Sequence, residues 1–264
     1  MPFLKFIEPR PGFPPDSEFP FSLEIVETLK KIAFDAPVTF FVGENGSGKS
    51  TLLEAIAAGF NLPTLGSYDV AADPTLAAAR RFAKVLRFAR SRPPKRGFFF
   101  RSEDFFGFTK RVMQSARELQ ELEDEYNETL SGYGRDLAVG MARGQRQAFE
   151  SRYGTNPDAA SHGESTLNAL GQRLVPDGLY LLDEPETPLA PVAQLALLSI
   201  LKEKVAANCQ FIIATHSPIL MAFPDALIYL FEDGKITPAK WDELEHVNLT
   251  RAFLNNPESF LRRL

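Results

Sequence analysis

The sequence predicts an α/β fold with a mostly parallel sheet, because short apolar runs alternate with segments of helical pattern. The runs 38–42, 179–182 and 211–215 are almost entirely apolar, which is typical of strands buried on both faces of a parallel sheet. Residues 50–59 and 192–207 have the length and composition of helices that connect such strands. This alternation is the main basis for the predicted fold class.

The two ends of the chain complete the predicted architecture. A short strand at 3–7 opens a region rich in Phe and Pro, so N-terminal β elements are expected, with one or two helical turns at 25–33. Near the other end, the apolar run 227–231 and the stretch 235–237 flank an Asp-Gly pair, which predicts a β-hairpin. Helical structure is expected from Asp242 onward, with a break near Pro257.

The middle of the chain predicts an insertion into the sheet. A strand is expected at 97–101, followed by an inserted helical subdomain at about 102–175. Its clearest element is a long amphipathic helix at 109–130, whereas 131–163 is interrupted by glycines and is left unassigned. The whole chain, 1–264, is expected to form a single domain.

Composition excludes several classes of protein. The chain has one cysteine and a net charge of −5, so neither a disulfide framework nor general coating of nucleic acid is expected. No apolar stretch approaches the ~20 residues of a membrane span, and the N-terminus does not resemble a signal peptide. We therefore expect a cytoplasmic protein without direct membrane insertion. Nine basic residues and no acidic ones lie between Arg80 and Arg101, which is either a phosphate-binding face or a solvated one.

A glycine-rich loop between the strand at 38–42 and the helix at 50–59 matches the phosphate-binding pattern G-x-x-x-x-G-K-[ST] in full. The residues are Gly43, Glu44, Asn45, Gly46, Ser47, Gly48, Lys49 and Ser50, with Thr51 following. Glycines let the backbone N–H groups turn toward the phosphates, and the helix start favours the same anion. Lys49 is expected to bind the β- and γ-phosphates and Ser50 to bind magnesium.

A second motif follows the apolar strand at 179–182, where Asp183 and Glu184 stand at the strand's end. Asp183 is expected to hold the magnesium ion, and Glu184 to polarise the attacking water as general base. An ordinary acidic turn at a strand end is the alternative interpretation. For Glu186, we favour a solvated or supporting role over a catalytic one.

These motifs resemble those of ABC-type ATPases, especially small stand-alone AAA/ABC ATPases nearer to the chromosome-maintenance and DNA-repair branch than to transporters. The resemblance covers nearly the whole chain and implies a P-loop NTPase core of ABC type that binds ATP and Mg²⁺. It also implies that His216, after the strand at 211–215, is the switch residue that contacts the γ-phosphate. The structural alternative is that His216 caps the helix that begins near Pro218.

The resemblance extends to the segment Ser161, His162, Gly163, Glu164, which is similar to the ABC signature. In that family Ser and Gly groups at a helix start bind the γ-phosphate held by the opposite subunit, so Ser161, Gly163 and Glu164 imply a nucleotide-dependent homodimer. His162 departs from the usual glycine, and a simple capping box is the alternative. Glu103 stands where a glutamine that helps bind magnesium is usual, and the stretch 187–190 lacks the usual aspartate.

The predicted function is ATP hydrolysis in a nucleotide-sandwich homodimer that drives a mechanical or regulatory switch, with nucleic acid or a partner protein as candidate ligands. The alternative is the ATP-binding subunit of an ABC membrane transporter, against which the missing glutamine and the divergent signature count. A non-hydrolysing scaffold is disfavoured by Glu184. Phe19 and Phe21 are candidates for adenine stacking.

Overall fold

The computed structural model describes residues 2–14, 16–65, 76–153 and 162–262. Its centre is a six-stranded sheet, in which five neighbouring strands run parallel and the last, at one edge, is antiparallel. In spatial order the strands are β5 (Arg96–Arg101), β6 (Gly178–Asp183), β7 (Gln210–Ala214), β3 (Val38–Gly43), β8 (Leu227–Glu232) and β9 (Lys235–Ala239). The predicted α/β class with a mostly parallel sheet is confirmed.

The register of the three central strands brings their carboxyl ends to one edge of the sheet. Ala214 at the end of β7 pairs with Phe41 of β3 on one side and with Asp183 of β6 on the other. Every residue of β6 and β7 is buried, which explains why both read as continuous apolar runs. The loops that follow these three strands therefore meet at a single place.

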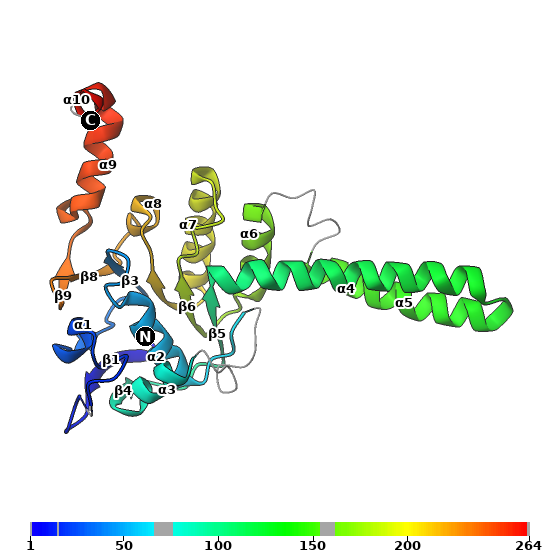
Figure 1. Cartoon of the computed structure of the whole chain (residues 1–264), viewed down its shortest axis with the longest axis horizontal. Helices are drawn as coiled ribbons and strands as arrows, with labels where there is room; N and C mark the ends of the chain where they lie inside the picture. Colours follow the sequence, from blue (N-terminus) through cyan, green and yellow to red (C-terminus); the bar gives the residue numbers. More distant parts are fainter. Residues whose placement is uncertain (1, 15, 66–75, 154–161, 263–264) are drawn as a thin grey trace.

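Helices cover both faces of this sheet, and side chains alternate between the two faces along each strand. On one face Phe41, Leu181 and Ile212 pack in a core with helix α2 (Lys49–Phe60). On the other face, a second core joins Phe40, Leu182 and Ile213 to helices α6 (His162–Arg173) and α7 (Pro191–Ala206). The strands are thus fixed from two sides (Figure 1).

A small antiparallel sheet in the order β2-β1-β4 packs against the α2 side of the molecule. It consists of β1 (Leu4–Pro9), β2 (Ile32–Ala33) and β4 (Leu86–Arg90), accompanied by the helices α1 (Glu24–Glu27) and α3 (Ala77–Lys84). Gln210 ties it to the main sheet, since its side-chain amide donates to Leu4 O at 3.0 Å and accepts from Leu4 N at 2.9 Å. The N-terminal β elements were expected, whereas β4 and α3 were not, and the region 25–33 holds one helical turn followed by β2.

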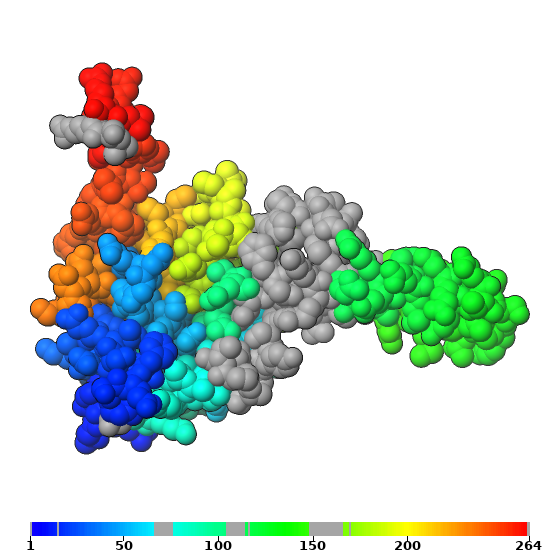
Figure 2. All heavy atoms as spheres, viewed as in Figure 1, coloured from blue at the N-terminus to red at the C-terminus, as the bar shows by residue number. Residues whose placement is uncertain are grey.

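Two long helices follow β5 and project from the body as an antiparallel pair (Figures 1 and 2). They are α4 (Ser102–Thr129) and α5 (Gly132–Tyr153). The first begins seven residues before its predicted start, and the second occupies a stretch that was left unassigned. The buried carboxylate of Glu123 on α4 connects the two helices, because Arg143 and Arg146 of α5 form ion pairs with it at 2.7 and 3.2 Å. The hydrogen bond from Arg143 is the main cause that lowers the pKa of Glu123.

The C-terminal part begins with the predicted hairpin β8–β9, in which Asp233 and Gly234 both have positive φ, 48° and 64°. The helical segments around it are α8 (Pro218–Met221), the 3-10 turn η2 (Trp241–Glu243), α9 (Glu245–Asn255) and α10 (Pro257–Leu261). The predicted break near Pro257 is confirmed. Among the described residues, no helix is both long and apolar enough to cross a membrane.

Candidate nucleotide site

The phosphate loop lies between β3 and α2, at the edge where the parallel strands end. Gly43 adopts φ 151°, and a Cβ there would collide with the carbonyl oxygen of Phe231. Gly48, directly before α2, adopts φ 92° beside the Ile25 side chain. Both positions therefore require glycine, and the loop can bring its backbone close to a phosphate.

Lys49 is folded back over this loop. Its side chain is only 4% exposed, and Nζ donates to Gly43 O at 2.8 Å and to Glu44 O at 2.7 Å. Burial lowers the pKa of Lys49, and the nearby carboxylates oppose that shift. A phosphate in the loop would offer the buried ammonium group a stronger, charged acceptor than two carbonyls.

The rest of the phosphate loop faces a cleft of about 740 Å³, whose walls include Gly43, Glu44, Asn45, Gly46 and Ser47. The hydroxyl of Ser47 is buried and has no hydrogen-bond partner among the residues that the structure describes. An unpartnered buried hydroxyl is costly, so a phosphate oxygen fits here. Thr51 lies in the first turn of α2 and is partly buried.

Ser50 and Asp183 meet where the magnesium ion was predicted. Ser50 Oγ donates to Asp183 Oδ1 at 3.1 Å, and burial raises the pKa of Asp183 to about 7 despite that hydrogen bond. A buried carboxylate with a hydroxyl beside it matches the oxygen ligands that Mg²⁺ prefers. In the described part of the chain, no group of three or more His, Cys, Asp or Glu could hold a metal alone. Phosphate and water oxygens would have to complete the coordination.

Glu103, the third predicted metal ligand, lies in the first turn of α4. It lines a pocket of about 250 Å³. Ser50, Ser102, Asp183, Glu184 and Thr187 are also part of the lining. The structure thus brings all three predicted magnesium ligands to one pocket, although Glu103 is the exposed member of the set.

Glu184 is held in an unusual backbone conformation at the turn after β6. Its φ is 47°, in the left-handed region that residues other than glycine rarely occupy, and its N–H donates to Ala214 O at 2.9 Å. The carboxylate is half-exposed and lies 3.7 Å from His216 Nε2. Strain of this kind is common where a side chain must be aimed at a reactive centre.

His216 follows β7 and belongs to the same site. Its backbone N–H donates to Glu186 Oε1 at 2.7 Å. Burial lowers the pKa of His216, and the positive charge of Lys49 lowers it further, so the neutral form dominates at pH 7. The capping alternative is not supported, because Ser217 caps α8 by accepting from Leu220 N at 3.1 Å.

Gln194, which no sequence motif indicated, links two segments of this site. Ser217 Oγ donates to Gln194 Oε1 at 2.6 Å, and Gln194 Nε2 donates to Leu189 O at 3.1 Å. The segment after β6 and the segment after β7 are therefore joined twice, by Glu186 and by Gln194. A shift of one segment would be passed on to the other.

Comparison with known proteins identifies the family. The sequence matches the family described as "AAA domain" over residues 23–66, and the family described as "AAA domain, putative AbiEii toxin, Type IV TA system" over residues 79–222. It is 31% identical over 230 residues to a "Putative ABC transporter ATP-binding protein" of Caldanaerobacter subterraneus, covering 80% of this chain and 84% of that protein. The chain belongs to the AAA/ABC-type ATPases. It is an ATP-binding enzyme that hydrolyses ATP.

Other ABC-type proteins show weaker similarity. The "Cobalt import ATP-binding protein CbiO" of Salmonella typhimurium is 26% identical over 235 residues, which cover 83% of this chain and 79% of the relative. Among solved structures, an Smc head domain derived from Pyrococcus furiosus is similar with a TM-score of 0.47 and 14% identity, covering 96% of this chain and all of the other.

The predicted ABC signature is only partly visible. Ser161 lies outside the described residues. His162, Gly163 and Glu164 form the first turn of α6, and their side chains are not described. Their position at a helix start agrees with the predicted type of anion site, but a role for Ser161, Gly163 and Glu164 in this ATPase stays a prediction.

The prediction that Phe21 stacks on adenine is wrong. Phe21 is fully buried in a cluster with Phe13 and Phe82, with ring centroids 6.1 and 6.0 Å away. Phe19 is exposed and stays a candidate. The sequence could not separate the two, because both lie in the same Phe- and Pro-rich segment.

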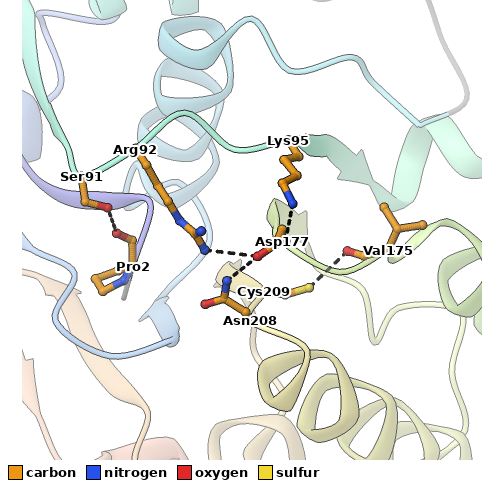
Figure 3. A network of polar contacts seen from close by, with 8 residues as sticks. All are labelled: Pro2, Ser91, Arg92, Lys95, Val175, Asp177, Asn208 and Cys209. Carbon is orange, nitrogen blue, oxygen red and sulfur yellow. Dashed lines mark hydrogen bonds and ion pairs between the residues drawn. The ribbon is translucent and has the colours of Figure 1, made fainter.

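Most of the basic stretch of this ATPase is engaged within the fold. Five of its nine members pair with carboxylates: Arg81 with Asp16 and Glu18, Arg87 with Glu8, Arg92 and Lys95 with Asp177, and Arg101 with Glu54. Figure 3 shows Arg92 and Lys95 converging on Asp177. Arg92 and Lys95, which follow β4, thus form a junction between the two sheets with Asp177, which directly precedes β6. Five of the nine positive charges of the stretch are paired.

Proposed function

We propose that the chain binds MgATP on its phosphate loop and hydrolyses it in a nucleotide sandwich formed by two copies, and that closing and opening of the sandwich drives a mechanical or regulatory switch. The observation that carries the proposal is the convergence of Glu184 and His216, 3.7 Å apart, beside the Ser50–Asp183 pair. A chain that only bound nucleotide would need no carboxylate aimed into this pocket in a strained conformation.

Each side chain has a distinct part in the reaction. Lys49 exchanges the carbonyls of Gly43 and Glu44 for β- and γ-phosphate oxygens. Ser50 and Asp183 would hold Mg²⁺, which supplies positive charge to the phosphates. Water attacks the γ-phosphorus as the bond to the bridging oxygen breaks, and the proton of that water passes to Glu184. His216, in its neutral form, donates a hydrogen bond to the γ-phosphate.

The decisive experiment compares wild type with Glu184→Gln in the presence of ATP and magnesium. Loss of a general base lowers kcat by about 10²–10⁴-fold, and the slow variant should accumulate as an ATP-dependent dimer measured by light scattering. Glu203→Gln, on the exposed face of α7, is the matched control. Normal turnover in Glu184→Gln, or a monomer under all conditions, would contradict the proposal.

A transporter subunit is the second candidate, favoured by the names of the similar transporter ATP-binding proteins from Caldanaerobacter and Salmonella. It predicts that the chain copurifies with an integral membrane protein from its own host, and that this partner changes the ATPase rate. Recovery of the chain entirely in the membrane-free fraction, with full turnover, would favour the stand-alone switch.

We infer that nucleic acid does not regulate the switch by binding to the basic stretch. Contacts to phosphates would first have to break the ion pairs of Arg81, Arg87, Arg92, Lys95 and Arg101. ATPase rates with duplex DNA, single-stranded DNA and RNA at several salt concentrations test this. Stimulation that falls steeply with salt would restore the nucleic-acid hypothesis.

A further inference from the structure

The last two helices, α9 and α10, leave the body of the protein from a firmly held base. Leu244 and Val247 are buried in the core shared with α7. Trp241 Nε1 donates to Pro218 O at 2.9 Å, and the guanidinium of Arg251 lies 4.9 Å from the centre of a Trp241 ring. The direction of the helices is therefore set by the core.

Beyond this base the described part of the two helices is largely exposed. From 248 to 262 every side chain is exposed except that of Phe260, which stacks edge-on against Phe253. Figures 1 and 2 show the pair standing clear of the body. Its large apolar side chains are nevertheless well exposed, namely Leu249 (55%), Phe253 (39%), Leu254 (72%) and Leu261 (58%). A short helix gains most of its stability from packing an apolar face, so this surface indicates a missing partner.

One face of α9 points to where that partner sits. His246, Leu249 and Phe253 follow one another at spacings of three and four residues, so they share a face. The first two line the same 740 Å³ cleft as the phosphate loop and His216. The face therefore begins inside the nucleotide cleft and continues outward as exposed apolar surface at Phe253.

We propose that α9 and α10 pack against a second copy of this chain when ATP draws two copies together. The inference rests on the proposed nucleotide sandwich. A copy that covers the phosphate loop would also face His246 and Leu249 of α9 in the cleft wall, and Phe253 continues the same face of that helix outward. The continuity of the two surfaces is what selects a second copy as the occupant.

Charge is compatible with contact between copies. In the described part of the tail, from α9 onward, Glu245 and Glu258 are balanced by Arg251 and Arg262. A neutral surface presents no repulsion to an identical one, whereas nucleic acid or an anionic lipid surface would favour an excess of positive charge. Apolar contact with a second copy thus fits the tail better than either of those ligands.

Amide hydrogen exchange on the full chain in the Glu184→Gln background tests the proposal, with and without ATP and magnesium. Amides of 249–261 are expected to exchange rapidly in the monomer and at least tenfold more slowly in the ATP-bound dimer. Neither Phe253 nor Leu254 lines the cleft. The double variant Phe253→Ser/Leu254→Ser is expected to raise the Kd of ATP-dependent dimerisation about tenfold or more. Ala252→Ser/Asn255→Ser, at other exposed positions of α9, is the matched control.

The outcomes separate the two proposals. A dimer whose tail exchanges as fast as that of the monomer, or whose Kd is unchanged by Phe253→Ser/Leu254→Ser, overturns the role of the tail and leaves the sandwich standing. A Glu184→Gln chain that never dimerises overturns both. Protection of the tail together with weaker dimerisation of the double variant, but not of the control, supports both.

Discussion

The backbone N–H of His216 donates to Glu186 Oε1 at 2.7 Å, which ties the end of β7 to the turn that follows β6. Burial raises the pKa of Glu186, while hydrogen bonds from Thr215 and from His216 N oppose that shift. Gln194 makes a second link between the same segments through Ser217. His216 is thus positioned by residues that belong to the same segment as Glu184.

The first prediction concerns Glu186. Replacing Glu186 with Leu removes the acceptor for His216 N, so the loop after β7 is no longer held in place. We expect kcat to fall about tenfold or more, because small displacements of catalytic groups are costly. Glu186→Gln keeps an acceptor oxygen and should retain most of the activity. ATP affinity, measured by nucleotide titration, should change little in either variant. Equal losses in the Leu and Gln variants would contradict a positioning role.

The second prediction separates the backbone strain at Glu184 from the role of its carboxylate in hydrolysis. Glu184→Ala and Glu184→Gly both remove the carboxylate and should both abolish turnover. Glycine adopts φ 47° without the steric cost that alanine meets, so Glu184→Gly should be more stable than Glu184→Ala by about 1 kcal/mol. Urea unfolding of the two variants measures the difference. Lower stability of the glycine variant would show that the conformation stores no strain.

The sheet was predictable because its strands are buried on both faces. β6 and β7 contain only buried residues, so their sequences are apolar except for Asp183 at the end of β6 and Gln210 at the start of β7. β4 was missed because two of its five residues are arginines, of which Arg87 pairs with Glu8 and Arg90 donates a hydrogen bond to Gly59 O. Its strand pattern was hidden by positive charge.

The helix α5 was missed because glycine usually interrupts helices. Gly134, Gly140 and Gly144 face open space on the projecting arm, where the absence of a side chain creates no cavity. The links through Glu186 and Gln194 were beyond sequence reasoning for another reason. Gln194 and Ser217 are far apart in the chain, and only the parallel pairing of β6 with β7 brings their loops together.

The third prediction concerns Lys49. A charge-assisted hydrogen bond contributes about 1.5–3 kcal/mol, so losing two of them to the phosphates should weaken ATP binding by about 100-fold or more. Lys49→Ala should show this by calorimetry. Lys202→Ala, on the exposed side of α7, is the control for loss of one positive charge. Unchanged ATP affinity in Lys49→Ala would refute the assignment of the phosphate loop.

The fourth prediction is that the free energy of unfolding depends on pH because Asp177 titrates differently in the folded and unfolded states. Hydrogen bonds from Lys95 and Asn208 are the main causes that lower the pKa of Asp177 to about 2, and Arg92 adds its charge (Figure 3). The ordinary value is 3.8, so the folded state holds the ionised form more strongly than the unfolded state does. This contribution is complete above pH ~4 and is lost as the pH falls toward ~2.

Asp177→Asn should therefore be less stable than wild type at pH 7, and the difference should shrink as the pH is lowered from 4 to 2. Urea midpoints measured across that range give the comparison, with Asp35→Asn as an exposed control. The reason is physical: protonation of Asp177 in wild type removes the same attraction to Lys95 and Arg92 that the substitution removes at every pH. A difference that stays constant down to pH 2 would show that these ion pairs do not hold the junction.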